Sequence, residues 1–320
     1  MRRLRALVVF AVFFWGSASA QATSDSARLP DPAMLRLASS NVLVLDTRSG
    51  QPIYSKNADD VTPIASITKL MTAMLVIDAN QPLDQEIQIT EEDVDNLRHS
   101  HSRLPVGSRL PRGQLLHLAL MSSDNRAAHA LGRTYPGGID AIVTEMNSRA
   151  AMLGMTNTHF REPTGLSDEN VSTAHDLAKM VKAASQYELI QRFTTNTEYY
   201  VQLRPSGRML EFHNTNALTK SDNWDIRVSK TGYIQEAGRC LVMLANIASR
   251  DFAIVLLDSF GSHTRTADAM RVKYWLETGK TLAVKPVSSR THSAKRSHRA
   301  ARSSTKRVAR TDSSRRTSKS

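Results

Sequence analysis

A serine hydroxyl and a lysine amine lie three residues apart at Ser66 and Lys69. Residues i and i+3 share one face of a helix, so the Lys69 amine can reach the Ser66 hydroxyl there. A serine hydroxyl is a weak nucleophile until a base takes its proton. Lysine can be that base only if burial or a nearby cation stabilises its neutral form. The spacing is common by chance, and Ser303 and Lys306 repeat it.

Two further polar elements follow in order, Ser123-Asp124-Asn125 and Lys230-Thr231-Gly232. The first interrupts an apolar helical pattern at 114–131, and such breaks tend to occur at functional sites. The second lies on a predicted strand, 226–234. A second Ser-Asp-Asn triplet begins at Ser221, in a polar loop too close to Lys230 to form another wall of the site. We therefore assign the role to the triplet at 123–125.

The elements that must position these residues fall into two kinds. Alternating apolar residues predict a hairpin at 41–54, and later strands at 226–234, 239–248 and 252–257 form an antiparallel meander. Helical periodicity is found at 69–79, 114–131, 139–153, 173–185 and 263–278. The pattern predicts an α+β fold: an antiparallel β-sheet flanked by helices, with an all-helical lobe inserted at about 61–190.

The three motifs together are the signature of penicillin-binding proteins and serine β-lactamases. Further segments between residues 41 and 279 resemble the exported D-alanyl-D-alanine endopeptidases among the low-molecular-mass penicillin-binding proteins. These segments are Glu162-Pro163-Thr164-Gly165-Leu166, Ser172-Thr173-Ala174 with Asp176-Leu177, Asn214 to Leu218, Val228 to Tyr233, Glu236-Ala237-Gly238 and Cys240-Leu241-Val242. The resemblance implies the fold shared by β-lactamases and DD-peptidases.

Chemistry and resemblance together suggest a role for each catalytic residue. Ser66 would attack the carbonyl carbon of a D-alanyl peptide bond and form an acyl-enzyme. Lys69, kept neutral by the nearby Lys230, would take the Ser66 proton. The Ser123 hydroxyl would pass a proton to the departing amine.

The remaining site residues would bind the substrate. The Asn125 amide would hold the substrate backbone, and Lys230 and Thr231 would bind the carboxylate beyond the scissile bond. Gly232 would let the substrate lie against the strand as an added one. The N–H groups of Ser66 and Tyr233 would form the oxyanion hole.

We expect an endopeptidase that acts on the stem peptides of peptidoglycan crosslinks and is inhibited by β-lactam antibiotics. The alternative is a D-alanyl-D-alanine carboxypeptidase, which trims uncrosslinked stems. A β-lactamase ranks third. The separation in sequence between Ser66 and Glu162 would suit a glutamate that activates the hydrolytic water, as in class A β-lactamases. However, the segment from Pro163 to Leu166 lacks the Glu-x-x-Leu-Asn pattern that positions this water. We interpret Glu162 as structural.

The N-terminus has the order of a secretory signal peptide: Arg2, Arg3 and Arg5, an apolar run at 6–15, and small residues ending at Ala20. An apolar run this short does not span a bilayer, which takes about 20 residues. We expect cleavage after Ala20 and a periplasmic protein, with an uncleaved anchor as the alternative. We interpret residues 21–38 as a linker and residues 39–283 as the catalytic domain.

The net charge of +12 belongs almost entirely to residues 285–320, where twelve Lys or Arg accompany a single acid, Asp312. Residues 284–320 have almost no large apolar side chains and are predicted to be disordered. The tail could contact an anionic envelope surface or have no partner. A nucleic-acid partner is disfavoured, because the tail has no aromatic residues for stacking and the signal sends the protein out of the cytoplasm.

Cysteine and histidine often take part in catalysis or metal binding, but in this sequence we interpret both as having no such role. Cys240 is the single cysteine, so no internal disulfide forms, and its apolar surroundings predict a buried strand thiol. His99 and His101 lie in a polar segment that we interpret as a solvated loop rather than a metal pair. We expect no cofactor and no metal.

Overall fold

The computed structural model describes residues 30–282. The predicted signal peptide, the basic tail and the Ser303–Lys306 repeat lie outside the described residues. Within 30–282 no helix is both long and apolar enough to cross a membrane.

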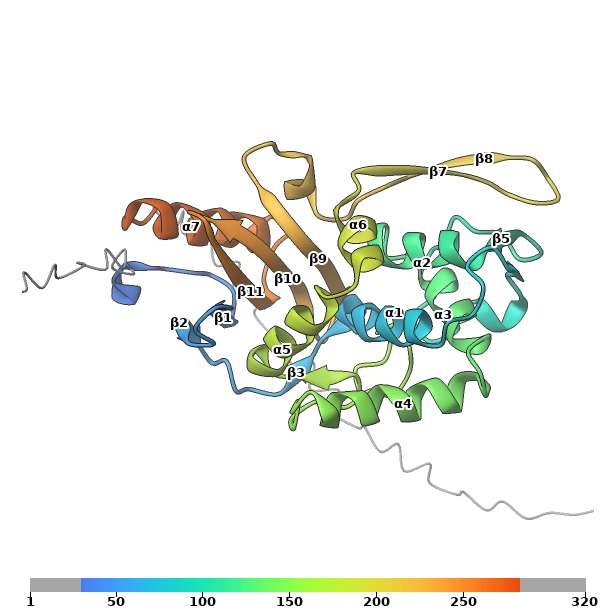
Figure 1. The fold of residues 1–320 in the computed structure, drawn as a ribbon, viewed down its shortest axis with the longest axis horizontal. Helices are drawn as coiled ribbons and strands as arrows, with labels where there is room; N and C mark the ends of the chain where they lie inside the picture. The colour runs from blue at the N-terminus through green and yellow to red at the C-terminus, as the bar shows by residue number, and fades with distance from the viewer. Residues whose placement is uncertain (1–29, 283–320) are drawn as a thin grey trace, which may run out of the picture. The chain divides into compact units, whose positions relative to one another are not determined.

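The centre of the fold is a five-stranded antiparallel sheet in the order β2-β1-β11-β10-β9 (Figure 1). The predicted hairpin forms β1 (Asn41–Asp46) and β2 (Pro52–Lys56). The predicted meander forms β9 (Asp225–Ile234), β10 (Gly238–Ile247) and β11 (Arg250–Ser259). Because β1 pairs with β11, the first and last strands of the chain meet in the middle of the sheet, and β9 is left at one edge.

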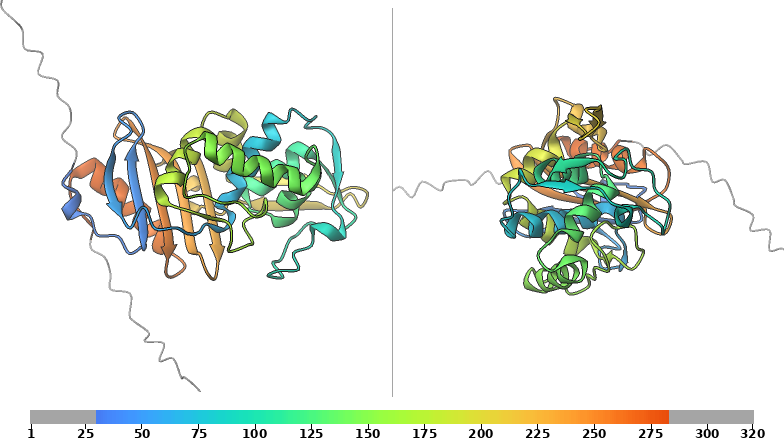
Figure 2. Two further views of the ribbon diagram at one scale, coloured as in Figure 1. Left: turned by 90° about the horizontal axis from the view of Figure 1, so that it is seen from below. Right: turned by 90° about the vertical axis from the view of Figure 1, so that its right-hand side faces the viewer.

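Both faces of this sheet are buried. On β11, Phe252, Ile254 and Leu256 pack with Val272 and Trp275 of α7 (Thr264–Thr278). The alternate residues of β11 join the core that contains α5 (Ala174–Ala184). Since successive strand side chains point to opposite faces, a continuous apolar run marks a strand covered on both sides. Figure 2 shows α5 and α7 on opposite faces of the sheet.

The remaining α-helices and the short strands lie between β2 and β9 in the sequence. The helices are α1 (Lys69–Asp78), α2 (Arg112–Met121), α3 (Asn125–Arg133), α4 (Gly138–Met152) and α6 (Glu188–Thr195). Short strand pairs accompany them: β3 (Thr62–Pro63) with β6 (Val171–Ser172), β4 (Glu86–Gln88) with β5 (Arg109–Pro111), and β7 (Glu198–Gln202) with β8 (Met209–His213). This arrangement confirms the predicted α+β class, while the lobe boundaries near 61 and 190 remain a prediction.

The prediction of one continuous helix over 114–131 is wrong. The segment forms α2 and α3, and the chain turns between them at Ser123, whose φ of 61° lies in the left-handed region. Asp124 caps the second helix by accepting a hydrogen bond from the Ala127 N–H at 2.9 Å. A left-handed residue followed by an N-cap ends one helix and begins another. The polar triplet is therefore a corner between helices.

Candidate active site

Ser66 lies at the point where the chain enters α1. Residues Ala65–Thr68 form one turn of 3-10 helix, and α1 continues from Lys69. The predicted reach is confirmed, because the Lys69 Nζ atom lies 2.8 Å from the Ser66 Oγ atom. Ala65, directly before Ser66, has a φ of 49°. A left-handed conformation costs a non-glycine residue about 1–3 kcal/mol, and such strain tends to cluster at functional sites.

Lys69 is buried and its amine has three neighbours. Besides Ser66, it donates to the Asn125 Oδ1 atom at 2.7 Å and to the Thr164 carbonyl oxygen at 2.6 Å. A neutral amine has two N–H donors and one lone pair. In the neutral form the two carbonyl acceptors would take both N–H donors, and the lone pair would then accept the hydrogen bond from the Ser66 hydroxyl. This geometry suits a general base.

Burial lowers the pKa of Lys69 to about 8, and the carboxylates of Glu162, Asp124 and Asp95 oppose that shift. We expected Lys230 to keep Lys69 neutral, but the dominant cause is desolvation. The charged form of a buried amine loses its hydration, so the neutral form is favoured. The stronger effect between the two lysines is on Lys230, whose pKa is lowered well below its usual range by burial, Lys69 and Arg265.

Lys230 and Ser123 form the second part of the site. Lys230 is buried on β9, and its Nζ atom donates to the Ser123 Oγ atom and to the Thr231 carbonyl oxygen, both at 2.9 Å. Thr231 donates to the Thr215 hydroxyl at 2.6 Å. Within residues 30–282 no hydrogen bond joins Ser123 to Ser66 or Lys69. Ser123 therefore contacts the second lysine and not the first.

Gly232 brings strand β9 against the turn that carries Ser66. A Cβ atom added at Gly232 would lie 3.0 Å from the Ile64 carbonyl oxygen and 3.2 Å from the Ser66 backbone nitrogen. These contacts are tighter than a side chain normally tolerates. We predicted that the missing side chain at Gly232 makes room for substrate. The structure gives another reason for a glycine at this position, because β9 lies directly against residues 64–66. The backbone leading into Tyr233 thus lies close to the Ser66 N–H.

The family model for D-alanyl-D-alanine carboxypeptidases matches residues 26–261 of the chain. The chain belongs to this family of serine peptidases. Curated relatives named D-alanyl-D-alanine endopeptidase include one from Pseudomonas aeruginosa, 47% identical over 267 residues and covering 82% of this chain and 86% of the relative. Another, from Escherichia coli, is 44% identical over 264 residues, with 82% and 85% covered. The family membership expected from the three motifs is confirmed.

Solved structures agree with this assignment. The Streptomyces K15 DD-transpeptidase matches the peptidase with a TM-score of 0.68 at 28% identity, covering 73% of this chain and 95% of that one. Penicillin-binding protein D2 from Listeria monocytogenes, solved in a cefotaxime-bound form, matches with a TM-score of 0.66 at 29% identity, with 74% and 96% covered. Both likenesses support the predicted fold type.

Asn125 and Tyr233 are the remaining predicted site residues of the peptidase. Asn125 already uses both ends of its amide on protein groups, since its Nδ2 atom donates to the Ser100 Oγ atom at 2.8 Å and its oxygen accepts from Lys69. It therefore links Lys69 to Ser100. Tyr233 has an exposed side chain, with the Arg239 guanidinium 4.6 Å from the ring centre.

Glu162 holds its own loop together, as the sequence interpretation required. Its carboxylate accepts hydrogen bonds from the backbone N–H groups of Thr164 and Gly165, both at 2.6 Å, and from the Asn170 side chain at 3.0 Å. A carboxylate occupied in this way orients the Thr164 carbonyl, which in turn binds Lys69. The loop at 162–167 is therefore part of the base's support.

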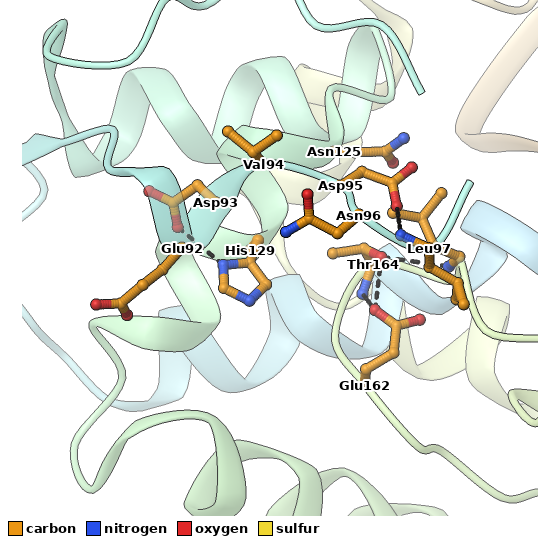
Figure 3. A pocket seen from close by; sticks show the side chains of 11 residues that line it. Glu92, Asp93, Val94, Asp95, Asn96, Leu97, Asn125, His129, Glu162 and Thr164 are labelled. Carbon is orange, nitrogen blue, oxygen red and sulfur yellow. Dashed lines mark hydrogen bonds and ion pairs between the residues drawn. The ribbon is translucent and has the colours of Figure 1, made fainter. Parts of the chain in front are cut away.

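A pocket of about 260 Å³ adjoins the candidate site (Figure 3). Asn125 and Thr164, the two acceptors of Lys69, belong to its wall. Its other lining residues are Glu92, Asp93, Val94, Asp95, Asn96, Leu97, His129, Glu162 and Leu166. The segment 92–97, which the sequence marked only as polar and irregular, thus reaches the neighbourhood of the base.

Four residues near the site were missed by the sequence reasoning: Asp95, Ser100, Thr164 and Arg265. Arg265, at the start of α7, donates to the carbonyl oxygens of Gly232 at 3.0 Å and Cys240 at 3.2 Å. Thr164 lies inside a segment that carried the family resemblance. For Ser100 the one available signal was its position between two histidines in an otherwise unexplained loop.

The buried thiol expected at Cys240 and the exposed loop expected at His99 and His101 are both found in the described structure. Cys240 is fully buried on β10, and burial raises the pKa of its thiol to about 11. His99 and His101 are exposed, and so are Asp222 and Asn223 of the second Ser-Asp-Asn triplet.

Proposed function

We propose that the protein is a penicillin-sensitive serine endopeptidase that cleaves D-alanyl bonds in peptidoglycan crosslinks. The observation that carries the proposal is the placement of the Lys69 amine 2.8 Å from the Ser66 hydroxyl, with its other two hydrogen-bond partners supplied by protein oxygens. The endopeptidase names of the Pseudomonas and Escherichia relatives support this choice of substrate.

In the proposed mechanism, the Ser66 Oγ atom attacks the carbonyl carbon of a D-alanyl residue as Lys69 takes the hydroxyl proton. The N–H groups of Ser66 and Tyr233 stabilise the oxyanion, a contribution of about 3–4 kcal/mol per donor. The C–N bond then breaks, and the proton that Lys69 took from Ser66 passes to the departing amine, with the Ser123 hydroxyl as the relay. Water finally hydrolyses the ester and regenerates the Ser66 hydroxyl.

The substrate is proposed to pair with the free edge of the sheet. Strand β9 is an edge strand, and an extended peptide can add to such an edge through backbone hydrogen bonds. The carboxylate beyond the scissile bond would meet Lys230 and Thr231. Bound there, an anion favours the charged form of Lys230 and offsets the lowering of its pKa by burial.

Intact-mass analysis after penicillin treatment tests the proposal. The wild-type protein should gain the mass of one penicillin, whereas Ser66→Ala should gain none. Ser221→Ala is the matched control, because it alters the second Ser-Asp-Asn triplet and should be modified like the wild type. Labelling of Ser66→Ala, or no labelling of the wild type, would contradict the proposal.

The second candidate is a D-alanyl-D-alanine carboxypeptidase, favoured by the description of the matching family. Purified crosslinked and uncrosslinked muropeptides separate the two activities. We expect the crosslinked dimer to be cleaved and the uncrosslinked pentapeptide to be trimmed more slowly. The reverse preference would overturn the endopeptidase assignment.

A β-lactamase is disfavoured because Glu162 is committed to backbone N–H groups of its own loop. We expect the penicilloyl-enzyme to persist, so the drug inhibits the peptidase and is not destroyed. Steady turnover of nitrocefin would contradict this expectation.

We also propose that the protein is exported to the periplasm, with cleavage after Ala20. The charged, apolar and small-residue order of the first twenty residues supports this. N-terminal sequencing of the mature protein should begin at Gln21, and an intact N-terminus would indicate an uncleaved anchor instead.

The basic tail is proposed to hold the enzyme to an anionic wall or membrane surface. Its eleven net positive charges would attract such a surface at low salt, and screening would weaken the attraction at high salt. Deletion of residues 285–320 should release the protein from isolated envelopes. Unchanged retention at low salt would refute this contact.

A further inference from the structure

A chain of hydrogen bonds leads away from the proposed base into the loop at 95–101. Lys69 donates to the Asn125 oxygen at 2.7 Å, and the Asn125 Nδ2 atom donates to the Ser100 Oγ atom at 2.8 Å. The Ser100 N–H donates to the Asp95 Oδ2 atom, also at 2.8 Å. Asp95 and Asn125 line the same pocket (Figure 3). Segments distant in the sequence thus meet at one lysine.

We propose that Ser100, fixed by Asp95, is a positioning residue that orients the Asn125 amide toward the catalytic base. The proposal rests on the function proposed above and adds a residue that acts through Asn125 rather than on the substrate.

The orientation argument starts from the near symmetry of a carboxamide. The oxygen and nitrogen ends of asparagine have almost the same shape, so only hydrogen-bond partners decide which end faces Lys69. Ser100 is held beside Asn125 because its backbone N–H donates to the Asp95 Oδ2 atom at 2.8 Å. Its Oγ atom accepts the hydrogen bond from the Asn125 Nδ2 atom at 2.8 Å, and this contact turns the Asn125 oxygen toward Lys69.

Asp95 is well suited to fix the backbone at Ser100, from whose N–H it accepts a hydrogen bond. Burial raises the pKa of the Asp95 carboxyl, but the hydrogen bonds from the Ser100 side chain and from the backbone of Leu97, Arg98 and Ser100 outweigh it and lower the pKa. The carboxylate therefore stays ionised and acts only as an acceptor. It also closes the loop on itself through the Leu97 and Arg98 N–H groups, at 2.9 and 3.0 Å.

Arg98 fastens the same loop to its surroundings. Its guanidinium donates to the Leu166 carbonyl oxygen and pairs with Glu236 at 2.8 Å, in the turn between β9 and β10. The first contact ties the loop to the 162–167 segment, which supplies the Thr164 acceptor of Lys69. Both protein acceptors of the base are thus held by connected loops, which restricts the directions in which the amine can point.

Substitution of Ser100 by alanine leaves every charge near Lys69 in place, namely Glu162, Asp124 and Asp95, and Lys230 on the facing strand. A change in the titration of acylation would therefore report the lost orientation of Asn125. An oriented carbonyl favours the ammonium form more than the neutral amine, so its loss lowers the pKa of the base.

The test follows the rate of acylation by penicillin as a function of pH, by intact mass, in the full-length protein. We expect Ser100→Ala to lower the plateau rate of acylation about tenfold, the effect of losing one hydrogen bond. It should also shift the acidic limb of the pH–rate profile to lower pH. Ser100→Thr, which keeps the hydroxyl, should restore both. His101→Ala, an exposed neighbour, should behave like the wild type.

A lower plateau rate in Ser100→Ala, with no shift of the acidic limb of the pH–rate profile, would mean that Ser100 only supports the fold. This result would overturn the proposal. Wild-type behaviour of Ser100→Ala, or an equal defect in His101→Ala, would overturn it as well. These results leave the proposed function standing as long as the wild type is acylated at Ser66. If the wild type itself is not acylated, the proposed function fails and this inference fails with it.

Discussion

Lys69 and Lys230 are both almost completely buried, yet their surroundings differ in kind. Lys69 is surrounded by oxygen acceptors and carboxylates, which hold its pKa near 8 against burial. Lys230 has two cations nearby, Lys69 and Arg265, which lower its pKa further. The first environment suits a group that must gain and lose a proton near neutral pH. The second suits a cation that becomes fully charged when an anion arrives.

The largest effect should come from Lys69→Arg, since a guanidinium cannot lose its proton and so cannot serve as the base. We expect acylation by penicillin to slow by about 10²–10⁴-fold, the usual contribution of a positioned base. The rate is measured by intact mass over time. A variant that keeps more than half of the wild-type rate would show that Lys69 is not the base.

Gly232→Ala should have the next largest effect, because it pushes apart the strand that carries Lys230 and the turn that carries Ser66. The added methyl group would approach the Ile64 and Ser66 backbone within 3.2 Å. We expect acylation to fall by more than about tenfold, because a displacement of about 1 Å can cost 10²-fold in rate. Gly113→Ala is the matched control, since its nearest contacts are at 3.4 Å and it lies in α2.

Lys230→Arg should have the smallest effect of the three, because it keeps a cation at the carboxylate site while changing its shape. We expect kcat/KM for a carboxylate-bearing peptide to fall by about tenfold, close to the lower value of about 1.5 kcal/mol for one hydrogen bond to a charged group. The loss should be mainly in KM. A fall in kcat as large as that of Lys69→Arg would remove the distinction between the two lysines.

The sequence alone was enough to identify the residues on both sides of this comparison. Residue type and spacing placed Ser66 and Lys69 together, and the strand pattern placed Lys230 on the meander. These predictions succeeded because periodicity is a local property, and a helical turn of either kind brings i and i+3 together.

The sequence could not predict how the two sides are held. The left-handed residues Ala65 and Ser123 are neither glycine nor asparagine, so nothing local announces them. Thr164 and Ser100 act through contacts with residues 95 and 25 positions away. Glu162 and Asp95 act through the backbone of their own loops. Such contacts exist only once the loops are packed. The pKa of Lys69 is likewise set mainly by burial rather than by Lys230, and burial also exists only in the folded protein.

The most direct test of the central claim, that neutral Lys69 takes the proton of Ser66, is the pH dependence of wild-type acylation by penicillin. The Lys69 pKa is about 8, below the ordinary lysine value of 10.5, so the base is protonated and inactive at low pH and neutral above that value. We predict that the rate rises with pH through an apparent pKa close to 8 and then levels off. A rate that stays constant from pH 6 to pH 10, or one that falls as the pH rises, would contradict the account.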